Sequence, residues 1–79
     1  MSNQDKKKTD ELFERLKNDF VYHPPKPGQT ERYGMLRSAA HALAEAFVAQ
    51  CPISRELSLA LTHLEESVMW ANASIARNE

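Results

Sequence analysis

The sequence lacks the usual means by which a very small protein is stabilised. It has 79 residues and one cysteine, Cys51, so it cannot form an intramolecular disulfide. Cys51, His23, His41 and His63 show none of the short paired spacings of a zinc site. Because a single core in a chain below about 80 residues supplies only ~3–5 kcal/mol, we expect this chain to associate with further copies of itself.

An excess of charge of one sign and long apolar runs are also absent. The chain has 10 basic and 11 acidic residues and a formal net charge of -1, which excludes the basic field that holds long nucleic acid. The sequence contains no run of about 18 apolar residues, so it predicts no membrane span. The start, "MSNQDKKKTDE", has no apolar stretch of a signal peptide. The sequence therefore predicts a cytoplasmic protein with neither a membrane nor long nucleic acid as partner, and an unpaired cysteine is typical of that compartment.

The N-terminal part of the chain is expected to contain a polar tail, a short helix and an extended arm. Residues 1–8 are expected to be a flexible tail, and residues 9–79 a single all-α domain that begins with a short helix from Thr9 to about Asn18. Three closely spaced prolines then predict an extended arm over about residues 19–28, because each removes a backbone donor and biases the residue before it toward an extended conformation.

A long antiparallel helical hairpin is expected after the arm. Its helices should run over about residues 29–50 and 54–77, because Pro52 ends the first helix and Ser54 can cap the second. A connection this short makes the two helices neighbours. The main apolar stripe of the first hairpin helix is expected to consist of Leu36, Leu43 and Phe47, with alanines filling much of the rest.

The second hairpin helix carries the strongest periodic pattern in the chain. Apolar residues recur at spacings of four and three, which is best explained by a seam packed against the first hairpin helix. The seam consists of Leu57, Leu61, Leu64, Val68, Ala71 and Ile75. A parallel line of mixed character is expected to face another subunit. That line consists of Leu59, His63, Glu66, Trp70, Ala73 and Arg77.

No arrangement of residues in the sequence indicates catalysis. Glu65 and Glu66 are adjacent, so on a helix they point about 100° apart and do not form a paired carboxylate site. His41 and His63 have no acid that would orient them, and are better explained as surface or interface residues. We therefore expect no enzyme, no metal and no cofactor, and a phosphodiesterase is disfavoured because the metal cluster and base that it needs are missing.

Ligand binding has better support, because aromatic and basic residues alternate through and after the arm. Aromatic rings can stack on a nucleobase, and lysine or arginine can pair with phosphate. The candidates are Tyr22, His23, Lys26, Arg32, Tyr33 and Arg37. A stiff arm of this kind would lose little entropy on binding. The alternative is that the aromatic residues fasten the arm to the hairpin while the basic residues are solvated.

Two stretches of the sequence, "YHPPKPGQTERYGMLR" and "CPISRELSLALTHLEESVMWANASIARNE", resemble the phage anti-CBASS sponge family of the second anti-CBASS type, whose hairpin domain is shared with a phage anti-Thoeris sponge. The resemblance covers about residues 20–79. In the first stretch it is carried by Tyr22-His23, Gln29, Arg32-Tyr33 and Leu36-Arg37. In the second it is carried by Pro52, Ser54-Arg55-Glu56, Leu64-Glu65-Glu66 and Met69-Trp70-Ala71-Asn72-Ala73.

The resemblance implies a non-enzymatic protein that captures the cyclic oligonucleotide second messengers of bacterial immunity in the cytoplasm of an infected host. It implies a homo-oligomer, expected to be a hexamer, with cyclic dinucleotides such as cyclic GMP-AMP in one set of intersubunit pockets and cyclic trinucleotides in another. By position, Tyr22 would stack on a base and Arg37 would pair with a phosphate of the dinucleotide. His23 and Ala39 would border the trinucleotide pocket, although Ala39 stands where a hydrogen-bonding side chain is expected.

A different class of function stays open on the residues alone. The line that contains Trp70, together with the hairpin tip, is compatible with a protein–protein interaction module that inhibits a host protein directly. Loss of the aromatic and basic residues near the arm would leave such a module intact but would abolish nucleotide capture.

Overall fold

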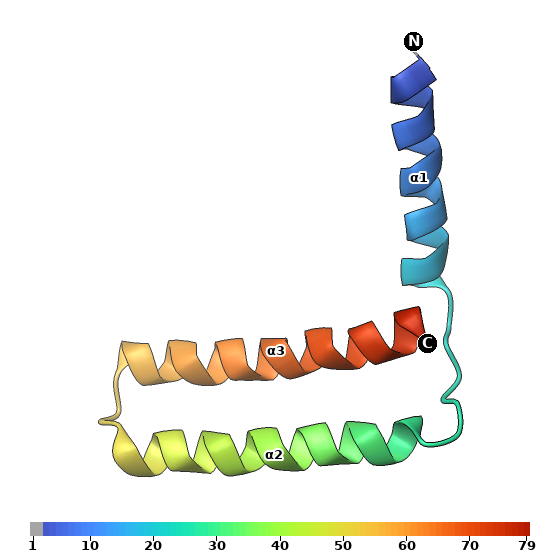
Figure 1. Ribbon diagram of the computed structural model, residues 1–79. Coiled ribbons are helices and arrows are strands. Elements are labelled where there is room, and N and C mark those ends of the chain that lie inside the picture. The colour runs from blue at the N-terminus through green and yellow to red at the C-terminus, as the bar shows by residue number, and fades with distance from the viewer. Residues whose placement is uncertain (1–2) are drawn as a thin grey trace.

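The computed structural model describes residues 3–79, and every regular element in that range is an α-helix. The helices are α1 (Asn3–Phe20), α2 (Gln29–Gln50) and α3 (Arg55–Asn78). Figure 1 shows α2 and α3 side by side as a hairpin, while α1 stands away from them and gives the chain the outline of an L. The all-α class predicted from the sequence is confirmed.

The turn between α2 and α3 is defined by hydrogen bonds that end one helix and begin the next. The backbone N–H of Cys51 donates to the carbonyl of Phe47 at 2.9 Å, and Pro52, which has no N–H, follows. Ser54 has an extended backbone, and its Oγ accepts a hydrogen bond from the Leu57 N–H at 3.1 Å. This is the N-cap expected of Ser54, and it satisfies one of the donors that a helix start leaves unpaired.

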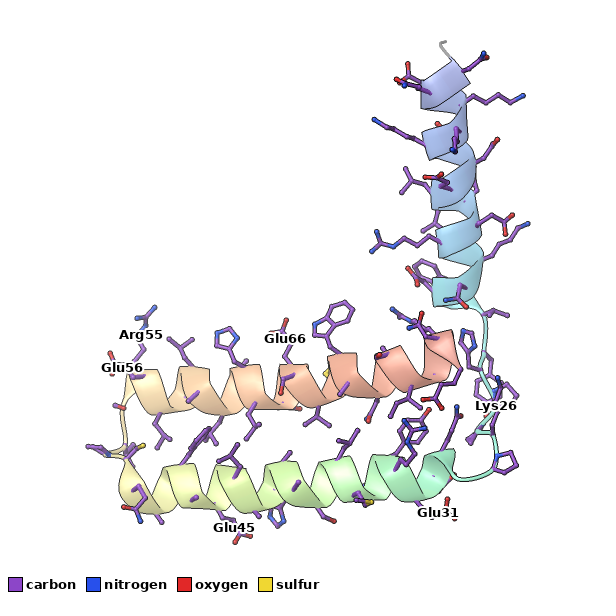
Figure 2. All side chains as sticks on the ribbon, viewed as in Figure 1. Lys26, Glu31, Glu45, Arg55, Glu56 and Glu66 are labelled. Carbon is purple, nitrogen blue, oxygen red and sulfur yellow. The ribbon has the colours of Figure 1, made fainter. Side chains whose placement is uncertain are left out.

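The seam between α2 and α3 is the place where the chain buries apolar surface. Leu57 is only 8% exposed, and the other predicted seam residues of α3, from Leu61 to Ile75, are half-buried. Figure 2 shows charged side chains on the sides that face away from the seam, with Glu66 on α3 and Glu45 on α2. The sequence-predicted pairing of the two helices is therefore present.

One predicted seam residue of α2 lies outside the seam. Leu43 is 46% exposed, whereas Leu36, Ala40 and Phe47 are half-buried. Leu43 lies about 60° from Ala40 around the helix, and the centre of the buried face runs through the small residue. The close approach that alanine permits thus leaves the larger Leu43 at the edge.

Helix α1 is longer than the sequence predicted. Of the expected tail, residues 1 and 2 lie outside the described residues, and residues 3–8 form the first turns of α1. Thr9, where the helix was expected to begin, lies inside α1, and its Oγ1 donates to the Asp5 carbonyl one turn earlier, at 2.9 Å. A lysine run near a terminus is usually solvated, and a flexible tail was expected for that reason. Lysine is nevertheless a good helix former, and Asp5 is favourable in the first turn of a helix, so the helix extends through these residues.

The apolar side of α1 has no cover within the described residues. Leu12, Phe13, Leu16 and Phe20 are 46–84% exposed. The radius of gyration is 17.9 Å, whereas a compact chain of this length has about 12 Å. An isolated helix of this length is marginally stable in water. Contacts that cover the apolar side of α1 would therefore stabilise it.

Truncation of the seam residue Leu57 tests where the stability of the hairpin comes from. We expect Leu57→Ala to lower the free energy of unfolding by about 2–3 kcal/mol, because it removes buried methyl groups and leaves a cavity. The matched control is Ile53→Ala at the hairpin tip, since Ile53 is 98% exposed. Urea unfolding followed by circular dichroism measures both, and equal losses in the two variants would contradict the seam as the main source of stability.

Candidate ligand-binding site

The arm between α1 and α2 ends in a turn that requires glycine. Gly28 has φ 85 and ψ -16, in the left-handed region. The turn is closed by the Gln29 N–H, which donates to the Lys26 carbonyl at 3.0 Å, and by the Lys26 N–H, which donates to Gln29 Oε1 at 2.9 Å. Gly28 offers no side-chain cap to α2, and the side chain of Gln29 instead fastens the arm to the first turn of α2 by accepting from the Lys26 N–H.

A pocket of about 440 Å³ lies where the arm meets α2 and α3. Of the predicted ligand-binding residues it brings together Tyr22 and His23 from the arm with Tyr33 and Arg37 from α2. Its remaining lining residues are Asp19, Val21, Asn72, Ala73, Ala76 and Arg77. We call this space the arm pocket. It combines two phenol rings with two guanidinium groups, which is the chemistry of a site for a nucleobase beside a phosphate.

The aromatic ring and the positive group best suited to a ligand are both accessible. Tyr22 is 80% exposed, so a large part of its ring can be covered by a base. Arg37 is exposed on the same side, and within residues 3–79 no hydrogen bond or ion pair engages its guanidinium group. Arg77, by contrast, is paired with Asp19 at 3.6 Å. Arg37 is therefore the cation of the pocket that is ready to accept an anion.

The start of the arm is fastened to the end of α3. His23 Nε2 lies 2.7 Å from the Asn18 carbonyl oxygen, and Asn18 Nδ2 donates to the Arg77 carbonyl at 3.3 Å. With the ion pair between Arg77 and Asp19, these contacts join the last turn of α1 to the last turn of α3. These contacts fix the point at which the chain leaves α1, and with it the position of Tyr22 at the pocket.

The structure does not bring Lys26, Arg32 and Ala39 into the lining of the arm pocket. Lys26 and Arg32 both contact Glu79 instead. Ala39 is exposed on α2, two residues beyond Arg37 and therefore about 160° away around the helix. The ligand roles of Lys26 and Arg32 stay predictions, and so does that of Ala39, which was predicted for a separate pocket.

Of the six lining residues that were not predicted as ligand residues, two carry polar side chains from α3, Asn72 and Arg77. Asn72 has a buried Oδ1 with no hydrogen-bond partner within residues 3–79, and buried polar groups are normally paired. Arg77 was assigned only to the mixed line of α3. Both lie in the stretch "CPISRELSLALTHLEESVMWANASIARNE" that resembles the family, and this resemblance is the sequence signal that could have selected them.

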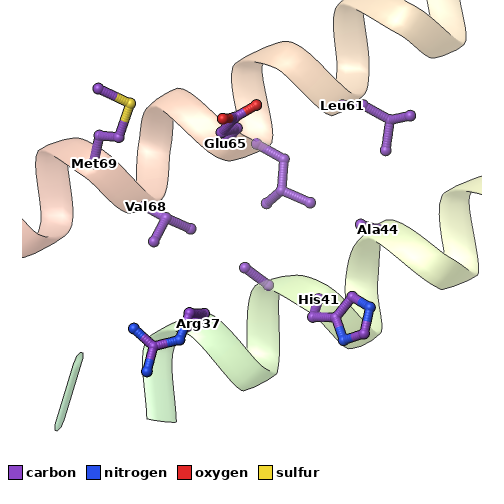
Figure 3. A pocket seen from close by; sticks show the side chains of 9 residues that line it. Arg37, His41, Ala44, Leu61, Glu65, Val68 and Met69 are labelled. Carbon is purple, nitrogen blue, oxygen red and sulfur yellow. The ribbon is translucent and has the colours of Figure 1, made fainter. Parts of the chain in front are cut away.

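A second pocket, of about 430 Å³, lies along the seam between α2 and α3. Figure 3 shows Leu61 and Val68 of α3 above α2, where Ala44 lies, with His41 and Arg37 at the α2 side. Arg37 lines both pockets. The two pockets thus meet at Arg37. The pocket along the seam is lined mainly by apolar side chains, so it suits the packing of further apolar groups better than the binding of an anion.

Other kinds of site have no counterpart in residues 3–79. This range contains no group of three or more His, Cys, Asp or Glu residues that could hold a metal ion. None of its helices is long and apolar enough to cross a bilayer.

Fold and site together define a helical hairpin that carries a proline arm and an aromatic and basic pocket at the open end of the hairpin. A family model described as "Acb2/Tad1, hairpin domain" matches residues 14–76. The chain therefore belongs to this family of phage anti-CBASS and anti-Thoeris sponge hairpins, as the resemblance indicated. Searches of curated proteins and of solved structures gave no match.

The two glycines allow a matched test of the turn that leads into α2. A Cβ at Gly28 would meet no atom within 4 Å, so any cost of Gly28→Ala comes from its positive φ, and we expect a loss of about 1–2 kcal/mol in the free energy of unfolding. Gly34 is helical and has only Arg37 Nη2 near its Cβ position, at 4.0 Å. Gly34→Ala should therefore raise stability by about 0.5–1 kcal/mol. Thermal unfolding compares the two, and a stabilising Gly28→Ala would contradict the turn geometry.

Proposed function

We propose that this protein captures cyclic oligonucleotide immune second messengers in the cytoplasm of an infected bacterium, so that the effectors of CBASS are not activated. Cyclic dinucleotides such as cyclic GMP-AMP are its main ligands. The observation that carries this proposal is the meeting of Tyr22, Tyr33 and Arg37 around one pocket, in a chain that belongs to a sponge family. The proposed activity is sequestration without chemical change.

The chemistry of the arm pocket suits a cyclic dinucleotide. Stacking of a base on an aromatic side chain contributes about 1–3 kcal/mol, and Tyr22 is exposed enough to provide it. Arg37 can hold a phosphate through two parallel hydrogen bonds. Stacking and charge pairing bind a ligand without breaking a bond, and a small cyclic ligand needs only a few positive groups, which agrees with a net charge of -1.

Cyclic trinucleotides are the second class of ligand in the proposal. Their binding was assigned to a separate pocket bordered by His23 and Ala39. His23 Nε2 is already within hydrogen-bonding distance of the Asn18 carbonyl, and Ala39 presents only a methyl group. We therefore propose that trinucleotides bind more weakly than dinucleotides.

The protein acts as a homo-oligomer, and we propose a hexamer. The arm pocket is open toward solvent in a single chain, so a neighbouring copy would supply a second wall and exclude water. The exposed apolar side of α1 and the exposed Trp70 of α3 offer surface for such contacts. Self-association would also compensate for the small core of the hairpin.

An interaction module that inhibits a host protein is the alternative function. It is favoured by Trp70, which is 62% exposed and is held by a hydrogen bond from its Nε1 to Glu66 Oε1 at 3.5 Å. Glu66 lies on the side of α3 that faces away from α2 (Figure 2). In this alternative the mixed line would bind the host protein, and the arm pocket would have no role.

Ligand-induced stabilisation separates these two functions. Cyclic GMP-AMP at 100 times its dissociation constant should stabilise the protein by about 2.7 kcal/mol, because it binds the folded state alone. The double variant Tyr22→Ala with Arg37→Glu should lose this stabilisation, measured as the shift in the unfolding midpoint. Ligand released by denaturation should be intact when analysed by mass spectrometry.

Matched variants control that experiment. Tyr22→Phe keeps the aromatic ring and should retain binding, and Arg55→Glu introduces the same charge reversal at the far end of the hairpin. If the Tyr22 and Arg37 double variant still blocks CBASS signalling in infected cells, the sponge proposal is wrong and the interaction module is favoured. Release of a linear product would indicate an enzyme.

The proposed assembly has its own measurement. Light scattering after size-exclusion chromatography should give a mass near that of six chains of 9.0 kDa each. Trp70→Glu places a charge in the proposed contact surface and should lower that mass. A wild-type protein that elutes as a monomer at micromolar concentration would contradict the hexamer and the shared pocket.

A further inference from the structure

Glu79, which follows α3, is joined to the last part of the arm and to the first turn of α2. Its Oε1 accepts hydrogen bonds from Arg32 Nη1 at 2.7 Å and from Gln29 Nε2 at 3.3 Å. Lys26 Nζ donates to the backbone oxygen of the same residue. A lysine of the arm and two side chains from the first turn of α2 thus converge on Glu79, about fifty positions later in the sequence. We call Lys26, Gln29, Arg32 and Glu79 the clasp.

Gln29 is the most enclosed part of the clasp. It is 4% exposed, and both ends of its carboxamide are used, since Oε1 accepts from the Lys26 N–H while Nε2 donates to Glu79. Hydrogen bonds shielded from water are stronger than exposed ones. One buried carboxamide therefore connects the arm backbone, the start of α2 and the end of α3.

The charges around Glu79 favour its ionised form. Hydrogen bonds from Arg32 and Gln29, and the positive charges of Arg32 and Lys26, lower the pKa of the Glu79 carboxyl from its ordinary 4.5. The same contact raises the pKa of Arg32. Because the pKa of Glu79 is lowered in the folded state, the contact contributes fully above pH 4.5 and is lost as pH falls through the lowered value. The clasp is therefore complete at neutral pH.

The clasp lies at one end of the arm, and a different set of contacts lies at the other. At the start of the arm, Asn18 and Asp19 are joined to Arg77 of α3. Tyr22 and His23 lie between these two attachments, and both line the arm pocket. An arm held at both ends against α3 presents Tyr22 in a limited range of positions, which reduces the entropy lost when a ligand binds.

We propose that Glu79 is a positioning residue for ligand capture, and that it acts through Lys26, Gln29 and Arg32 to hold the arm with Tyr22 over the arm pocket, opposite Arg37. This inference rests on the proposed function. It gives Lys26 and Arg32 a role different from the phosphate contacts predicted for them, because Arg32 is paired with the Glu79 carboxylate and Lys26 with the backbone oxygen of Glu79. No residue of the clasp other than Lys26 belongs to the arm, so the positioning is exerted from the hairpin.

The test compares affinity and arm order in Glu79 variants of the full chain. We expect Glu79→Gln and Glu79→Ala to weaken the binding of cyclic GMP-AMP three- to ten-fold by calorimetry, and to speed amide hydrogen exchange at Lys26. Glu56→Gln, at the other end of α3, is the matched control and should change neither (Figure 2). Arg32→Glu should weaken binding like the Glu79 variants.

A charge exchange distinguishes positioning from a general loss of stability. The double variant Arg32→Glu with Glu79→Arg restores an opposite-charge pair at the same place, and it should recover most of the affinity that Arg32→Glu loses. Failure of this rescue would overturn the proposal.

The remaining outcomes separate this inference from the proposed function. If the wild type binds cyclic nucleotides and the Glu79 variants bind equally well, Glu79 has no positioning role. An affinity that rises in Glu79→Gln would mean that Glu79 competes with the ligand for Lys26 and Arg32, which also overturns it. If the wild type binds no cyclic di- or trinucleotide, the proposed function itself fails, and the ligand role of Glu79 with it.

Discussion

The packing of α3 on the small residues of α2 is the interaction on which every other feature depends. Leu57 anchors it near the tip, and Ala40 and Ala44 let the helices approach. The arm, the arm pocket and the attachment of α1 all lie at the opposite, open end. They can form only when the seam has brought the start of α2 beside the end of α3. A narrow apolar contact thus determines the position of polar groups that contribute little to the seam itself.

Helix boundaries at the hairpin tip could be predicted from the sequence because single residues determine them. Pro52 cannot continue a helix, and Ser54 supplies the cap that is observed. The start of α1 could not be predicted in the same way, since no capping residue marks it and the lysine run suits a solvated tail as well as a helix. The prediction that Leu43 belongs to the buried stripe of α2 was wrong, because the buried face of this helix is centred on alanine and not on the large apolar residues.

Local composition identified only part of the candidate site. Tyr22, Tyr33 and Arg37 stand out because aromatic and basic residues alternate near the arm. Their neighbours Asn72 and Arg77 come from the far end of the chain, and no local pattern shows that these ends meet. For the same reason the sequence could not show that Arg32 meets the Glu79 carboxylate and Lys26 the Glu79 backbone oxygen, and the phosphate contacts of both residues stay predictions.

The buried carboxamide of Gln29 couples the folding of the chain to the assembly of its pocket. Its bonds to Lys26 and Glu79 close a loop that spans the whole hairpin, and closure of so long a loop has an entropic cost that the seam must offset. The pocket is accordingly a property of the closed hairpin and not of the arm, so that any loosening along the helices is transmitted to its walls. Conversely, a ligand bound between the arm and the hairpin would act as one more cross-link, and by the proposed function it would add stability to a protein whose own core is small.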